Sequence, residues 1–180
     1  MNQKVTKKIR KYPSGQEPDS IIPKENMSYR YLLGKSGENP LVVICMNPSA
    51  ADEKNSDATI ERIISASVKL ENDGWMMFNT YPERATNAND MSDFCEELSK
   101  ENVEVLKNYL TEKHVAEVWG AWGDLKHDAL RRGRDEITSL LSELKIRVFH
   151  FGALTKKGNP RHPLNRQEKW EISQNSKRFL

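Results

Sequence analysis

Four short apolar segments limit what this chain can fold into more than any other feature of its sequence. They are residues 41–46, 75–79, 115–120 and 146–152, and longer stretches with apolar residues at helical spacing separate them. Continuous apolar runs of this length are typical of strands that are covered on both faces. Strands that alternate with helices predict a parallel sheet with helices on both sides. We therefore expect an α/β fold, a three-layer α/β/α sandwich around a central, mostly parallel four-stranded sheet.

The stretches between these segments predict three helices. The first follows Asp57, which we expect to be its N-cap because Asp is favoured at that position. The others are expected within residues 92–113 and 125–144. Residues 29–33 are expected to form a short edge strand before the first buried one.

The length of 180 residues fits one domain, which we expect to span residues 28–180. Residues 1–27 are polar and contain three prolines, and five basic residues but no acidic one occur within residues 1–12. This composition predicts a polar, basic N-terminal arm that lies on the domain or is mobile.

Composition and motifs argue against several classes of protein. No apolar run of 18 residues occurs, so we expect no membrane span and no membrane partner. The histidines and two cysteines lack ligand or disulfide spacing, so we expect no metal, no disulfide framework and a cytoplasmic location. The motifs of P-loop NTPases and of serine hydrolases are absent, and we expect no cofactor. The net charge of +2 does not by itself indicate a nucleic-acid partner, although basic residues are concentrated at both ends.

Each expected strand leads into a distinctive polar cluster. Because the carboxyl ends of parallel strands meet at one edge of a sheet, where ligands bind in open α/β folds, these clusters should lie together. The sequence therefore predicts one site, formed by Asn47-Pro48-Ser49, Asn79-Thr80-Tyr81, Gly120-Ala121-Trp122-Gly123 and Arg161-His162-Pro163.

Five motifs run through these clusters in a fixed order. They read MNPSAAD at residues 46–52, DATIER at 57–62, Asn79 followed by RAT at 84–86, AWG at 121–123, and PRHPL at 160–164. In order and composition they resemble a bacterial and phage family catalogued as domain of unknown function 1643. The resemblance covers roughly residues 28–170 and carries no function with it.

More distantly, the same four clusters are similar to those of the uracil-DNA glycosylase superfamily. In that superfamily the first loop positions the water, an Asn after the second strand reads the base edge, and a late strand carries a Trp-Gly pair. The last loop supplies a His that stabilises the departing base anion and a Leu that enters the DNA stack. The resemblance implies that Asn47 positions the water and that Asn79 reads the base edge. It likewise implies that His162 stabilises the departing base anion and that Leu164 enters the DNA stack. Since the first loop here lacks the carboxylate of the most active branch, we expect base catalysis to be weak or shared with Asp52 or Asp57.

The resemblance thus implies recognition of a nucleobase, nucleotide, nucleoside or nucleic acid, with hydrolysis of an N-glycosidic bond as its reaction. Two alternatives stay open: a non-catalytic nucleotide-binding module, and a phage-type accessory or inhibitor protein that acts through a protein partner. The same residues could also have only local roles, as turn, cap or packing residues. The catalytic candidates are Asn47, His162 and Asp52, and the ligand-binding candidates are Pro48, Ser49, Asn79, Arg84, Trp122, Arg161 and Leu164.

Overall fold

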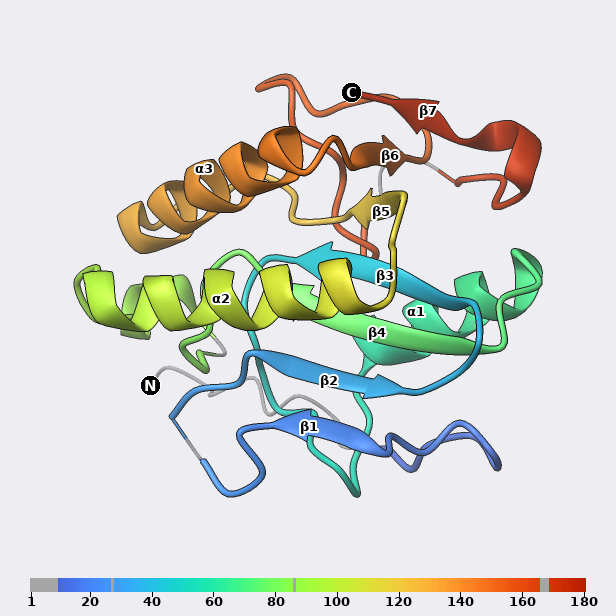
Figure 1. Ribbon diagram of the computed structural model, residues 1–180, viewed down its shortest axis with the longest axis horizontal. Helices are drawn as coiled ribbons and strands as arrows, with labels where there is room; N and C mark the ends of the chain where they lie inside the picture. The colour runs from blue at the N-terminus through green and yellow to red at the C-terminus, as the bar shows by residue number, and fades with distance from the viewer. Residues whose placement is uncertain (1–9, 27, 86, 166–168) are drawn as a thin grey trace, which may run out of the picture.

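The four apolar segments form the parallel centre of a larger, mixed sheet (Figure 1). The computed structural model describes residues 10–26, 28–85, 87–165 and 169–180. Within these residues the sheet has seven strands in the order β1-β2-β4-β3-β5-β6-β7. The strands are β1 (Ser20–Ile22), β2 (Leu32–Lys35), β3 (Pro40–Cys45), β4 (Gly74–Asn79), β5 (Glu117–Gly120), β6 (Arg147–His150) and β7 (Arg178–Phe179).

The prediction of a four-stranded sheet is therefore wrong in size, although its parallel strands are the expected ones. β3 pairs in parallel with β4 and β5, and β5 pairs in parallel with β6. β1 and β2 add an antiparallel edge on one side, and β7 adds one on the other. β2 corresponds to the edge strand expected at residues 29–33, although it begins at Leu32. β1 and β7 escape a search for buried runs because they are short and none of their residues is fully buried.

Three α-helices connect the parallel strands, as the apolar spacing predicts. They are α1 (Ala58–Lys69), α2 (Glu96–Glu112) and α3 (Asp128–Glu143). The predicted cap is confirmed, because one carboxylate oxygen of Asp57 accepts the backbone N–H groups of Thr59 and Ile60. None of the described helices is long and apolar enough to cross a lipid bilayer.

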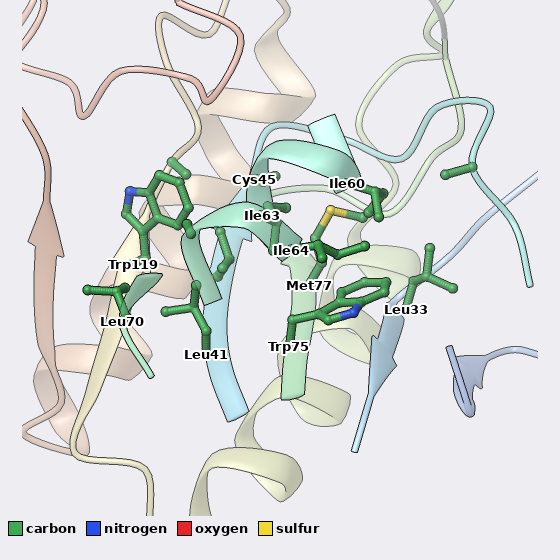
Figure 2. Packing of buried hydrophobic residues seen from close by; sticks show 14 of the residues in the cluster. Leu33, Leu41, Cys45, Ile60, Ile63, Ile64, Leu70, Trp75, Met77 and Trp119 are labelled. Carbon is green, nitrogen blue, oxygen red and sulfur yellow. The ribbon is translucent and has the colours of Figure 1, made fainter. Parts of the chain in front are cut away.

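The helices cover both faces of the sheet (Figure 1). Helix α1 packs Ile60, Ile63 and Ile64 onto one face, against Trp75 and its neighbours (Figure 2). Helices α2 and α3 pack on the other face, where they bury Phe78 and the alternate residues of the strands. Right-handed crossovers require this arrangement, because the chain moves from β3 to β4 in one direction across the sheet and from β4 to β5 and β6 in the other.

The first described residues hold the segment that leads into α1. The ring of Tyr12 is buried and stacks on Trp75, with ring centroids 6.1 Å apart, and its hydroxyl donates to the carbonyl oxygen of Asp52 at 2.6 Å. The backbone of Arg10 pairs with that of Ser56 in both directions. Residues 10–12 of the expected arm thus pack on the domain, and β1 belongs to the sheet, while residues 1–9 and 27 lie outside the described part.

Gly133 of α3 sets how closely this helix approaches the end of β4. A Cβ atom at this position would lie 2.1 Å from the carbonyl oxygen of Thr80. We predict that Gly133→Ala destabilises the protein by about 1–3 kcal/mol, because the forced shift of α3 outweighs the gain of about 1 kcal/mol in helix propensity.

Urea unfolding followed by circular dichroism measures this change. Ser139→Ala is the control, because Ser139 is exposed on the same helix. A Gly133→Ala protein more stable than wild type would contradict the close approach of α3 to Thr80.

Candidate functional site

The carboxyl ends of β3 and β5 form the point where the connections of the sheet diverge. From β3 the chain passes to α1 on one face, whereas from β5 it passes to α3 on the other. Neighbouring strands whose connections leave toward opposite faces open a crevice between their loops, and ligands of doubly wound sheets bind there.

A cavity of about 190 Å³ lies at this edge of the sheet. For comparison, a cavity of roughly 150 Å³ accommodates one benzene ring. The cavity is therefore large enough for a single ring or a group of similar size. Its walls combine charged, amide, hydroxyl and imidazole groups with apolar ones: Arg30, Cys45, Met46, Asn47, Ser49, Asp57, Thr59, Met77, Ala85 and His162.

Asn47 is fixed in this wall by two backbone carbonyl groups. Its Nδ2 donates to the oxygens of Pro48 at 2.9 Å and of Ala85 at 2.8 Å. The N–H of Ala85 in turn donates to the oxygen of Pro48 at 3.1 Å. Because both amide hydrogens are used, Oδ1 of Asn47 is left as an acceptor, and no donor among the described residues reaches it.

His162 reaches the cavity from the loop after β6. Its Nδ1 accepts the backbone N–H of Leu164 at 3.2 Å, so the neutral ring carries its hydrogen on Nε2. Gly123, after β5, supports this loop by donating its N–H to the oxygen of Pro160 at 2.9 Å. A Cβ atom on Gly123 would lie 3.1 Å from Cβ of His162, so the two loops are in direct contact.

Of the two carboxylates considered as bases, the structure brings Asp57 to the cavity and not Asp52. Asp57 lines the wall, and only its Oδ1 accepts from the described part of the chain. Oδ1 of Asp52 accepts the N–H groups of Lys54 at 2.8 Å and Asn55 at 2.7 Å, within its own loop. Partial burial opposes ionisation of Asp52, but these hydrogen bonds and the charge of Arg84 outweigh it, so its pKa lies below the usual value.

Two arginines lie behind the loop that carries Asn47. Arg30 is 1% exposed and lines the cavity, and its Nη1 donates to the carbonyl oxygen of Ala51. Nη1 of Arg84 donates to the same oxygen at 3.1 Å and to that of Ser49 at 3.2 Å. Burial, followed by the charge of Arg84, lowers the pKa of Arg30 to about 10, and burial also lowers the pKa of Arg84. Sequence reasoning missed Arg30, although a cation within an otherwise apolar strand segment is an available signal.

The remaining predicted residues lie beside the cavity and not in its walls. Asn79 is completely buried next to Cys45, and neither of its amide atoms has a hydrogen-bond partner within the described part of the chain. Trp122 is 2% exposed and packs in the core on the α2 and α3 face. Arg161 donates from Nε to the oxygen of Ala153 at 2.9 Å and so closes its own loop. Of the predicted residues, the cavity thus brings together Asn47, Ser49 and His162, while Pro48, Arg84 and Leu164 lie outside its lining.

A comparison with protein families matches residues 30–164 to the family described as "Protein of unknown function (DUF1643)". The chain belongs to the DUF1643 family. The match begins at Arg30 and ends at Leu164, so the DUF1643 region includes every residue that lines the cavity. Comparisons with curated proteins and with solved structures found no match.

The contact between the two loops of the DUF1643 region can be tested at Gly123. Gly123 has φ +68° and Gly158 has φ +78°, so alanine strains the backbone at both positions, by about 1 kcal/mol. Only at Gly123 does the added Cβ meet His162, because nothing lies within 4 Å of a Cβ on Gly158.

We predict that Gly123→Ala shifts the imidazole resonances of His162 in a ¹H–¹³C correlation spectrum, whereas Gly158→Ala leaves them in place. Both variants should lose similar stability in urea. Unchanged His162 resonances in Gly123→Ala would show that the β5 loop does not position this side chain.

Proposed function

We propose that the cavity binds a nucleobase-bearing ligand and that its residues support hydrolysis of an N-glycosidic bond. One observation carries the proposal: Asn47, Asp57 and His162 line a single small cavity at the divergence of β3 and β5. An acceptor amide, a carboxylate and a neutral imidazole donor are the groups that this reaction needs.

In the proposed reaction a water molecule attacks the anomeric carbon of the sugar. Oδ1 of Asn47 accepts a hydrogen bond from this water, and the carboxylate of Asp57 takes up its proton. The carbon–nitrogen bond breaks as the new carbon–oxygen bond forms, and the base leaves with the electron pair. Nε2–H of His162 donates to the developing negative charge, and the proton from the water finally neutralises the base.

Asn79 supports the choice of a nucleobase as the bound group. Asn79 is the last residue of β4 and pairs in register with Cys45. It lies on the face of the sheet where Cys45 and Met77 line the cavity. A buried amide with no partner costs about 1–3 kcal/mol, and an amide-like base edge offers the complementary donor and acceptor. We propose that a small rearrangement on binding brings Asn79 to the base.

The likeness to the uracil-DNA glycosylase superfamily supports the same reading of the fold. Loops that resemble its four loops occur here in the same order along the chain, after the four parallel strands. We therefore propose that the parallel centre of the sheet is a glycosylase-like sheet with three added edge strands.

A non-catalytic binding module is the second candidate, and the fixed roles of two site residues favour it. Nδ2 of Asn47 ties two loops together, and Oδ1 of Asp57 caps α1, so both residues would be needed to shape a cavity even without chemistry. In this case ligand binding occurs without any released product.

The test is to incubate the protein with pooled nucleosides, nucleotides and short uracil- or mismatch-containing oligonucleotides, and to measure retained ligand and released base by mass spectrometry. For an enzyme we predict that His162→Ala lowers base release by about 100- to 1,000-fold while ligand is still retained. His114→Ala is the matched control, because His114 is an exposed histidine at the end of α2.

Retained ligand without released base in the wild type would favour the binding module, and neither signal would point to a protein partner. If oligonucleotides are retained, their affinity should fall steeply with added salt, because binding to the strand releases counterions.

The choice between the two carboxylates gives a second test. We predict that Asp57→Asn lowers turnover by about 100-fold or more, because it removes the base while Asn still caps the helix. Asp52→Asn should leave turnover near the wild-type value, since Asp52 does not line the cavity. The two variants are compared by their rates of base release at equal ligand saturation. A larger loss of turnover in Asp52→Asn than in Asp57→Asn would refute the role of Asp57.

A further inference from the structure

Arg30 is a buried cation in the cavity wall that forms no ion pair with a carboxylate of the described residues. It is 1% exposed, and its Nη1 donates to a backbone carbonyl oxygen, that of Ala51. Its Nε has no hydrogen-bond partner among the described residues. Burying a charge without a paired opposite charge is costly, so this position gains stability from any anion that reaches it.

The charges around Arg30 do not remove this need. Arg84 is a second guanidinium near it, and the two share the oxygen of Ala51. Asp57 is the one carboxylate among the described lining residues. Its charge favours protonated Arg30, but it forms no ion pair with Arg30, and burial together with Arg84 still lowers the pKa of Arg30. Asp52 is held in its own loop, and burial raises the pKa of Tyr12, whose hydroxyl is therefore neutral.

We infer that Arg30 binds the anionic oxygens of a phosphate group inside this cavity. Thr59, whose side chain bears a hydroxyl group, lines the same walls and supplies a further donor group. Arg84 does not line the cavity, but it adds a second positive charge next to Arg30. Two positive charges suit a phosphate better than a singly charged carboxylate, because a phosphate monoester carries nearly two negative charges. This inference rests on the proposed function for its ligand class: it makes the ligand a nucleotide and not a nucleoside or a free base.

Isothermal titration calorimetry with three probes tests the inference: inorganic phosphate, pooled nucleoside 5′-monophosphates and pooled nucleosides. For the wild type we expect phosphate to bind, and the monophosphates to bind more tightly than the nucleosides. Arg30→Met should weaken both phosphate-containing probes by about 10- to 100-fold and leave nucleoside affinity nearly unchanged. Arg62→Met is the matched control, because Arg62 is exposed on α1.

Arg30→Lys is a second, more conservative variant, to be used if Arg30→Met does not fold. It keeps the positive charge but loses the planar fork, so we expect phosphate affinity between those of the wild type and Arg30→Met. If neither variant folds, the wild-type comparison of monophosphates with nucleosides decides the question. A short single-stranded oligonucleotide, titrated separately, shows whether the phosphate comes from a strand or from a free nucleotide.

The outcomes separate this inference from the proposed function. Nucleosides and monophosphates that bind equally well would overturn the role of Arg30 and keep the nucleobase site. Phosphate binding that depends on Arg30, with no gain from an attached nucleoside, would keep the anion site and overturn the proposed function. Equal phosphate affinity in the wild type and Arg30→Met would overturn the anion site.

Discussion

The carbonyl oxygen of Ala51 accepts hydrogen bonds from two guanidinium groups, those of Arg30 and Arg84, and this arrangement fastens the loop between β3 and α1. The next carbonyl oxygen along the loop, that of Asp52, accepts from the hydroxyl of Tyr12. Charged donors form stronger hydrogen bonds than neutral ones, so the loop is fixed at its middle as well as at its ends. The position of Asn47 at the start of the loop depends on this attachment, because a site on an unrestrained loop loses its geometry.

The centre of the fold could be predicted from the sequence because its signals are local. Each parallel strand is an apolar run, and Asp57 caps its helix through atoms only two or three residues away. The outer strands carry no such signal. β7 has two exposed residues, and β1 is recognisable only by its pairing with β2, which itself begins at Leu32 and not at Tyr29. Their strand state depends on the neighbouring strand and therefore on tertiary structure.

The candidate site also combines residues that could be predicted from the sequence with residues that could not. Asn47 and His162 follow buried strands, so the rule for parallel sheets places both at one edge. Arg30 could not be assigned in this way, because its hydrogen-bond acceptor lies 21 residues further along the chain. Sequence alone also leaves open the choice between Asp52 and Asp57. The conformation of the loop between β3 and α1 decides which of the two carboxylates reaches the cavity. Trp122 follows the expected strand end, yet its ring turns into the core beside Gly120.

Several buried polar atoms without partners lie in the cavity wall or beside the cavity. Nε of Arg30, Nε of Arg84 and both amide atoms of Asn79 belong to this set among the described residues. Such atoms reduce the stability of the folded protein, and any group that supplies the missing partner offsets this cost. A sugar or a simple carboxylic acid would satisfy only one kind of group here. The proposed nucleotide joins anionic oxygens, which would accept from Arg30, to an amide-like heterocyclic edge, which would pair with Asn79 after the small rearrangement proposed above.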